Sequence, residues 1–163
     1  LFNATIHKRP NHLLILENNE PFQLLSYDLE LTEGKYFLNT HSTNPLLKTE
    51  TIDKAIETFF NNLDKYNSLF SVTELKKRFF FEDGTPINHD IDKVIKTQKL
   101  SSIYEENSNI YIFSRSVFLE RKNRIGEKPL LYPINQFEAI DIDVEYDYFI
   151  AESIMKKRID KNV

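Results

Sequence analysis

The sequence predicts a single α/β domain, and three observations indicate this fold class. The chain has 163 residues, 40% of them hydrophobic, which suffices to bury one core. Residues 35–39 and 68–72 are each typical of a buried strand, and the segment between them has the apolar periodicity of a helix. A strand, a helix and a second strand in this order indicate a parallel crossover unit.

The composition narrows the class of protein. The formal net charge is −4, from 21 basic and 25 acidic residues that form no long block of one sign, which argues against a nucleic-acid surface. The absence of cysteine excludes disulfides, thiolate metal sites and cysteine nucleophiles. No apolar run approaches the roughly 20 residues that a membrane helix needs, and the start has neither a signal-peptide pattern nor an initiator Met. We therefore expect a cytoplasmic protein without membrane contact, whose chain is part of something longer.

The first half of the chain alternates apolar runs with polar loops. Residues 22–25 are typical of a short helix. The strand at residues 35–39 ends in the polar loop 40–45, and such loops bind ligands in open α/β sheets, so His41 is a candidate contact. Thr49 is the expected N-cap of the clearest helix. Its apolar stripe indicates core packing and comprises Ile52, Ala55, Ile56, Phe59, Phe60 and Leu63.

The second half contains a long polar excursion between buried strands. Basic residues 76–78 indicate a solvated edge more readily than an anion site, and residues 82–85 form a turn. Residues 86–109 are polar and irregular, which is typical of a lid, a binding arm or a partner surface. The remaining predicted elements are a strand at residues 110–113, a helix at 115–121 capped by Ser114, an edge strand at 129–132 and a last helix that packs Phe149, Ile150, Ile154 and Met155 inward.

Asp141 and Asp143 lie one residue apart in a short apolar run. In a strand, residues i and i+2 share a face, so both carboxylates would converge while Ile140 and Ile142 face a packed layer. Two carboxylates that close repel each other unless a cation lies between them, and Mg²⁺ commonly takes one or two carboxylates together with substrate phosphates. The alternative is structural: Asp143 caps a helix that begins after it, and Asp141 is solvated at a strand end.

The glycines are few and scattered. Gly34, Gly84 and Gly126 are the only ones in the chain. A loop whose backbone amides surround a triphosphate normally needs clustered glycines. The sequence therefore predicts no glycine-rich phosphate loop within this chain.

Several stretches, taken in order, resemble the acylneuraminate cytidylyltransferases, the enzymes that make CMP-sialic acid. They are His41-Ser-Thr-Asn-Pro-Leu46, Thr51-Ile-Asp-Lys-Ala55, Ser68-Leu-Phe-Ser-Val72, Asn107-Ser-Asn-Ile-Tyr-Ile112, Arg124-Ile-Gly126 and Ala139-Ile-Asp-Ile-Asp143. Their common order over nearly the whole chain makes the resemblance more specific than any single motif. It implies a three-layer α/β/α nucleotidyltransferase fold, Rossmann-like with a mostly parallel sheet. It also implies one domain over residues 1–163, in which residues 76–128 include a small dimerisation arm.

The resemblance also implies a reaction. In that family the hydroxyl of an acidic sugar attacks the α-phosphorus of CTP and releases pyrophosphate, while Mg²⁺ neutralises the developing charge. It assigns the metal-binding and catalytic role to Asp141 and Asp143, and substrate binding to Arg9, His41, Asn107 and Tyr111. His41 stands where many members have a glutamine. CTP, an acidic sugar, Mg²⁺ and a homodimeric partner are the expected ligands and partners.

One departure from the family leaves alternatives open. The family begins with a basic glycine-containing loop that binds the CTP phosphates, and this chain shows none. We expect the chain alone to keep the sugar and metal side of the site, to bind CTP weakly and to turn over little or nothing. Two alternatives are a sister nucleotidyltransferase with a different sugar substrate and a non-catalytic interaction or assembly module derived from this fold.

Overall fold

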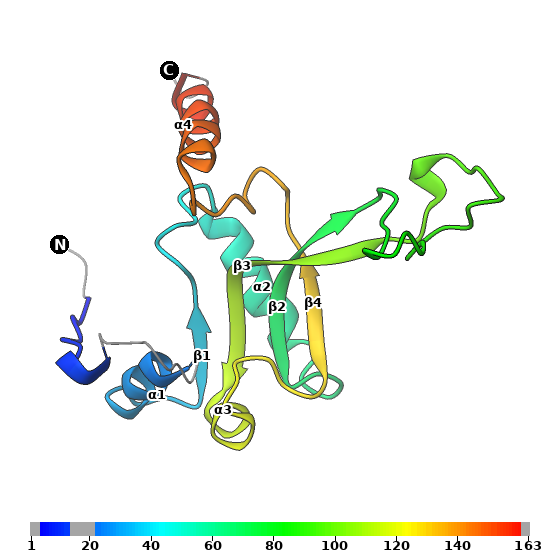
Figure 1. The fold of residues 1–163 in the computed structure, drawn as a ribbon. Helices are drawn as coiled ribbons and strands as arrows, with labels where there is room; N and C mark the ends of the chain where they lie inside the picture. Colours follow the sequence, from blue (N-terminus) through cyan, green and yellow to red (C-terminus); the bar gives the residue numbers. More distant parts are fainter. Residues whose placement is uncertain (1–3, 14–21, 161–163) are drawn as a thin grey trace.

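The computed structural model describes residues 4–13 and 22–160, and its centre is a mixed four-stranded sheet (Figure 1). The strands are β1 (Tyr36–Asn39), β2 (Ser68–Leu75), β3 (Ile103–Ser114) and β4 (Pro129–Pro133), in the order β1-β3-β2-β4. β3 is antiparallel to β1 and β2, whereas β4 is parallel to β2. Three strands therefore run in one direction, but β3 runs against them between β1 and β2, the two strands of the predicted crossover. The sheet is mixed rather than mostly parallel, because only the β2–β4 pairing is parallel.

Helices cover both faces of this sheet, which confirms the predicted three layers. α2 (Thr49–Phe60) packs on one face, and α1 (Gln23–Glu30) and α3 (Arg115–Arg121) pack on the other. α4 (Glu145–Asp160) follows the last strand, and short 3-10 helices span Asn11–Leu13 and Thr97–Lys99. Among the described residues, no helix combines the length and the apolar character needed to cross a membrane.

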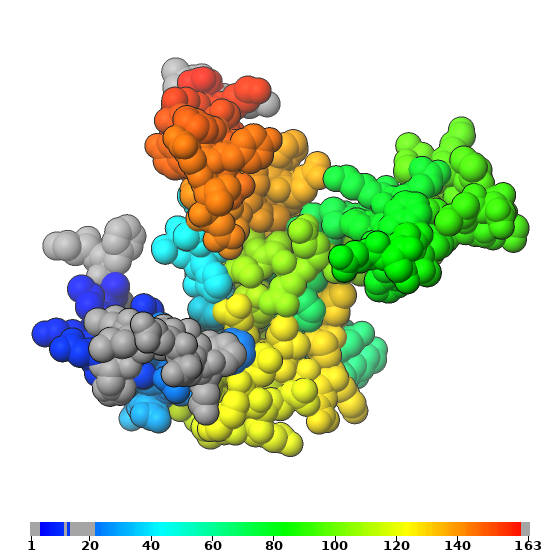
Figure 2. Space-filling view, in the orientation of Figure 1, coloured from blue at the N-terminus to red at the C-terminus, as the bar shows by residue number. Residues whose placement is uncertain are grey.

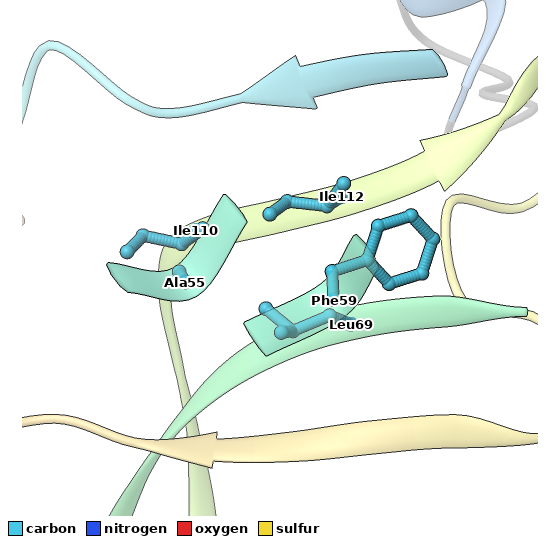
Figure 3. Packing of buried hydrophobic residues seen from close by; sticks show 5 residues of the cluster. All are labelled: Ala55, Phe59, Leu69, Ile110 and Ile112. Atoms are coloured by element: carbon cyan, nitrogen blue, oxygen red, sulfur yellow. The ribbon is translucent and has the colours of Figure 1, made fainter. Parts of the chain in front are cut away.

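The alternation along β3 supplies both cores. Ile110 and Ile112 face α2, where Ala55 and Phe59 cover them together with Leu69 of β2 (Figure 3). Tyr111 and Phe113 point to the opposite face, against Leu29 of α1 and Phe118 of α3. This is the period of two that the sequence predicts for a strand buried on both sides. Each fully buried side chain of this size contributes roughly 1.5–3 kcal/mol.

β3 is longer than the sequence predicted. It has 12 residues and begins at Ile103, so residues 103–109, expected to be irregular, belong to a strand. Its register against β2 shifts between Phe70 and Val72, which pair with Tyr111 and Glu106 respectively. The residues of β3 between these pairs form a bulge, defined here as residues 107–110. A polar bulge of this kind hides the alternation by which a strand is recognised.

Hydrogen bonds from β2 hold the bulge. The Ser71 hydroxyl accepts from the Ile110 N–H at 2.8 Å and donates to Asn107 Oδ1 at 2.6 Å. The Asn107 amide nitrogen donates to Thr73 Oγ1 at 3.1 Å. Ser108 has a φ of 56°, a left-handed backbone conformation that interrupts the extended strand. The polar sequence of residues 107–109 therefore builds this bulge.

Residues 76–102 leave the sheet between β2 and β3 as an arm that stands away from the body (Figure 2). Leu75 and Ile103 pair at its base. At its first turn the Phe81 N–H donates to the Thr85 carbonyl at 2.8 Å, and Gly84 has a φ of 84°, which confirms the predicted turn. Apolar side chains are exposed along the arm at Phe80, Phe81, Ile87, Ile91, Val94 and Ile95.

α4 packs less than its pattern predicted. Within this helix Ala151 is the buried residue, while Phe149, expected inside, is 55% exposed. Ile154 and Met155 are partly buried. Figure 1 shows the helix projecting from the edge of the sheet, so it has no broad surface of the described chain to pack on. The prediction of Phe149 as a core residue is therefore wrong.

Candidate functional site

Most of the predicted site residues line two cavities, and Tyr111 lines neither but contacts lining residues of both. The first, called here the cationic cavity, has a volume of about 670 Å³ and is lined by Arg9, Phe22, Leu24, Leu25, Asp28, Asn39, Thr40, His41, Ser42, Thr43 and Arg124. The second, the acidic cavity, measures about 340 Å³ and is lined by Thr73, Glu105, Glu106, Asn107, Ser108, Ala139, Asp141, Asp143 and Asp147. The structure thus brings together Arg9 with His41, and Asn107 with both aspartates.

Uncompensated positive charge characterises the first cavity. Its single carboxylate, Asp28, is already bound to His7 Nδ1 at 3.0 Å. Within residues 4–13 and 22–160, neither Arg9 nor Arg124 forms an ion pair. Guanidinium groups present several N–H donors in a plane and match carboxylates or phosphates. The cavity is therefore suited to an anionic ligand.

Arg124 is a central residue that the sequence reasoning did not assign to the site. Its guanidinium carbon lies 3.4 Å from the centroid of the Tyr111 ring. Its Nη1 donates to Asn39 Oδ1 at 2.7 Å and is 3.1 Å from His41 Nε2. Asn39 is the last residue of β1, and His41 lies two residues further along, in the loop at the carboxyl end of the strand. Ligand-binding loops are expected at such a position.

A close approach of two loops fixes the backbone next to Arg124. The Gly126 N–H donates to Ser68 Oγ at 2.8 Å, and a Cβ atom at this glycine would overlap the Asn67 side-chain amide. The glycine therefore allows the loop to lie against the start of β2. An arginine two residues before a glycine in a polar loop was the signal in the sequence, but it does not reveal what the arginine contacts.

Tyr111 lies between Arg124 of the cationic cavity and Glu106 of the acidic cavity. Its side chain is buried, its ring stacks on His41 at a centroid distance of 6.4 Å, and its hydroxyl donates to the Glu106 carboxylate. Burial raises the pKa of the Tyr111 phenol, and the hydrogen bond to Glu106 raises it further. The phenol therefore remains protonated at neutral pH, and its hydroxyl is a donor toward the acidic cavity.

Asp141 and Asp143 line one cavity as predicted, but not because they lie in a strand. Residues 139–143 have no regular secondary structure, so the predicted i, i+2 geometry of a strand is wrong. The predicted cap is wrong as well. α4 begins at Glu145, and the Asp147 carboxylate accepts from the N–H groups of Asp143 at 3.2 Å and Val144 at 3.1 Å. The segment is instead tied to the loop after β1 by the Ile142 N–H, which donates to the Thr43 carbonyl at 3.0 Å.

The acidic cavity fits a hard divalent cation. Asp141 Oδ1 is buried and, among the described residues, has no hydrogen-bond partner. Such an oxygen is costly unless a ligand or cation satisfies it. No cluster of three or more His, Asp or Glu side chains suited to a metal is found within residues 4–13 and 22–160. A pair of carboxylates is nevertheless what Mg²⁺ takes when substrate phosphates and water complete its shell.

Asn107 lines the acidic cavity, but its amide is already engaged. Its oxygen accepts from Ser71 and its nitrogen donates to Thr73, and the residue is 8% exposed. These contacts give Asn107 a structural task in the bulge. Its substrate-binding role stays a prediction.

Glu138 ties the segment after β4 to the start of α2, a contact that the sequence reasoning did not identify. This residue is 5% exposed, and its carboxylate accepts from the Lys48 N–H at 3.2 Å and the Thr51 hydroxyl at 2.6 Å. Lys48 Nζ lies 3.4 Å away. Burial acts to raise the Glu138 pKa, but these hydrogen bonds and the ammonium outweigh it, so the pKa lies below its ordinary value. The predicted Thr49 cap is wrong, because Lys48 stands at the N-cap position and, among the described residues, no side chain caps α2, while Glu138 binds the start of the helix.

Comparisons with known proteins agree with this architecture. Residues 22–156 match the family model described as "Cytidylyltransferase". The chain is 25% identical over 126 residues to the post-translational flagellin modification protein B of Campylobacter coli, covering 74% of this chain and 53% of that protein. It is 24% identical over 163 residues to the N-acylneuraminate cytidylyltransferase of Escherichia coli O18:K1:H7, covering 96% of this chain and 38% of that protein. The chain thus spans about half or less of the length of these relatives.

A solved structure supports the fold. The crystal structure of 4-diphosphocytidyl-2C-methyl-D-erythritol synthase from Anaerococcus prevotii superposes with a TM-score of 0.54 at 14% identity, covering 81% of this chain and 64% of that one. At this identity the likeness concerns the fold alone. The family match, in contrast, extends over most of the chain and confirms the resemblance predicted from the sequence. The chain belongs to the cytidylyltransferase family.

Proposed function

We propose that the chain supplies the sugar and metal side of a nucleotidyltransferase that activates an acidic, sialic-acid-like sugar with CTP and releases pyrophosphate. The observation that carries this proposal is that one buried tyrosine, Tyr111, contacts both Arg124, which lines the cationic cavity, and Glu106, which lines the acidic cavity. The family match and a relative named N-acylneuraminate cytidylyltransferase support it. An acidic sugar offers an anionic group for the first cavity, and metal-bound phosphates suit the second.

The residues of the two cavities have different proposed tasks. Arg9, His41 and Arg124 would bind and orient the sugar acid, because they offer donors and, among the described residues, the one carboxylate that lines their cavity is bound to His7. Asp141 and Asp143 would hold Mg²⁺, which neutralises charge on the triphosphate when bound. The protonated Tyr111 hydroxyl keeps Glu106 engaged and separates the two groups of opposite charge.

A glycine-rich phosphate loop is not part of this proposal. The three glycines lie far apart, and Gly34 and Gly84 are at the start of β1 and in the arm. We therefore propose that the chain by itself binds CTP weakly and turns over little. Measurable synthesis of a CMP-sugar by the 163-residue chain would contradict this part of the proposal and leave the binding of the sugar acid unaffected.

Calorimetric titration of the chain with N-acetylneuraminate, in the presence of Mg²⁺ and CTP, tests the substrate class. We expect this sugar acid to bind, and N-acetylmannosamine, a neutral amino sugar, to bind at least about tenfold more weakly because it lacks the carboxylate. Equal affinities would contradict an acidic substrate. Preference for another sugar acid would indicate a sister enzyme of the same fold.

The exposed apolar side chains of the arm favour a homodimer as the partner. Exposed apolar surface is common at protein interfaces, and the arm exposes Phe80, Phe81 and Val94. We expect the chain to self-associate, and Phe80→Ser combined with Phe81→Ser to shift it toward monomer in sedimentation velocity. A monomeric parent chain would contradict this. Dimerisation without any binding of sugar acid or CTP would favour the non-catalytic assembly module.

A further inference from the structure

We propose that Arg124 fixes the tautomer of His41 with its hydrogen on Nδ1. His41 can then only donate a hydrogen bond to a ligand, so the cationic cavity selects a ligand with a hydrogen-bond acceptor at that point. Arg124 is then a positioning residue, and His41 determines specificity. The fixed state of His41 follows from the contacts of Arg124 alone. Only the identity of the ligand as a sugar acid rests on the proposed function.

The hydrogen bond between these residues has a single possible direction. Arg124 Nη1 lies 3.1 Å from His41 Nε2. A guanidinium carries five N–H donors and no acceptor, and it keeps its proton at every physiological pH. His41 Nε2 must therefore accept through its lone pair. In a neutral imidazole the other nitrogen then carries the hydrogen, so His41 is the Nδ1–H tautomer.

Arg124 has little freedom to turn away from His41. Its guanidinium lies over Tyr111 at 3.4 Å and faces Phe22 on the other side at 5.8 Å from the ring centroid. The same Nη1 also donates to Asn39 Oδ1 at 2.7 Å. Two aromatic rings and one amide oxygen thus hold the donor. His41 stacks on the same Tyr111 ring, which limits its own rotation.

The remaining ring nitrogen is available to a ligand. Within the described chain no atom accepts a hydrogen bond from His41 Nδ1, and His41 lines the cationic cavity. The cavity also contains Arg9 and further N–H groups of Arg124. A ligand atom that reaches Nδ1–H must accept, as a carboxylate or carbonyl oxygen does. A glutamine side chain, present at this position in many of the family that the sequence resembles, offers both a donor and an acceptor.

Nitrogen NMR tests the tautomer without any ligand. Long-range ¹H–¹⁵N correlation spectra of the ¹⁵N-labelled chain at pH 8 distinguish protonated from unprotonated ring nitrogens, and His41→Gln identifies the His41 signals by their loss. We expect Nδ1 to be protonated and Nε2 unprotonated. Arg124→Met removes the donor and should convert this fixed state to a mixture of tautomers. Arg121→Met is the matched control, because Arg121 is exposed and pairs with Glu127 at 3.0 Å.

A protonated Nε2 in the parent chain would overturn the proposal, as would an unchanged Nδ1–H state in Arg124→Met. The backbone spectrum reports whether each variant is folded. If Arg124→Met does not fold, the tautomer of the parent decides the question by itself.

Binding of N-acetylneuraminate tests the consequence for specificity. His41→Gln keeps an N–H donor and should change the affinity by less than about threefold, whereas His41→Glu offers only acceptors and should weaken it by about 10- to 100-fold. Unchanged affinity in His41→Glu would overturn the donor role. A parent chain with the Nδ1–H tautomer that does not bind the sugar acid would refute the proposed substrate and leave the role of Arg124 intact.

Discussion

The cationic and the acidic cavity differ in charge, in size and in the elements that build them. The first uses the N-terminal segment, α1, the loop after β1 and the loop after α3, and it presents donors. The second uses the bulge of β3 and the segment after β4, and it presents carboxylates. The Tyr111 side chain is buried between Arg124, which lines the first cavity, and Glu106, which lines the second. The comparison shows how a small sheet keeps two opposite electrostatic environments adjacent: a protonated, buried ring separates them.

Removing the shared ring should have the largest effect. Tyr111→Ala deletes a side chain that is 1% exposed and should lower the free energy of unfolding by about 3–5 kcal/mol, as measured by urea denaturation. Tyr104→Ala, on the same strand but 44% exposed, should change it by less than about 0.5 kcal/mol. A loss below about 1 kcal/mol in Tyr111→Ala would show that the two cavities do not depend on this ring.

Removing Asp141 and Asp143 together should abolish metal binding in the acidic cavity and leave the cationic cavity unchanged. Asp141→Ala combined with Asp143→Ala should weaken Mn²⁺ binding, used as a probe for Mg²⁺, by more than about 100-fold, because changes in outer-shell partners alone cost 10- to 100-fold. Glu120→Ala combined with Asp160→Ala removes the same charge from exposed positions and should leave binding unchanged. Similar affinities in both double variants would refute the metal site.

The acidic cavity can also be perturbed through the hydrogen bonds that support the bulge of β3. Ser71→Ala leaves the Ile110 N–H and Asn107 Oδ1 without their partner and should cost about 1–3 kcal/mol of unfolding free energy. The His41 ring signals, which report the cationic cavity, should not change. Ser101→Ala, at an exposed position, is the control. A large change at His41 would mean that the two cavities are not independently supported.

The smallest effect should come from the contact of Glu138 with the start of α2. Glu138→Gln keeps an acceptor for Thr51 but loses the charge, and should cost about 1–2 kcal/mol at pH 7. Because the folded pKa of Glu138 is lowered, its contribution is present above pH 4.5 and is lost as the pH falls through the folded pKa. Urea denaturation at pH 7 and at pH 3 should show the difference between parent and variant shrinking in acid.

Glu50→Gln provides the matched control for that titration. Glu50 also lies at the start of α2 but is exposed. Its change should cost less than about 0.5 kcal/mol. A difference between parent and Glu138→Gln that is equal at both pH values would contradict the role of the ionised carboxylate.

Local periodicity predicted the elements of this fold well. The alternation of Ile110 with Tyr111 placed both residues on the correct faces of β3, and Ser114 caps α3 by accepting from the Val117 N–H as expected. Both features depend on residues a few positions apart. The two aspartates also line one cavity, although not through the strand geometry from which their convergence was predicted.

Features that depend on distant partners could not be predicted in this way. Glu138 contacts Thr51, 87 residues earlier, and Arg124 contacts Asn39, 85 residues earlier. In the sequence each looks like an ordinary charged surface residue. The strand geometry predicted for residues 139–143 failed for the same reason, because Ile142 bonds to the loop at Thr43 instead of a strand. The sequence pattern of α4 likewise does not tell which of its faces has a partner.

The arm has a further consequence for how such proteins diversify. Its two ends are held together by the pairing of Leu75 with Ile103, so everything between them is a loop closed by the sheet. The entropy cost of closing a flexible loop rises only with the logarithm of its length, by about 0.6 kcal/mol for each doubling. Insertions, deletions and substitutions of exposed residues between Leu75 and Ile103 should therefore change the free energy of unfolding of the sheet very little. Variation can accumulate there while both cavities keep their geometry.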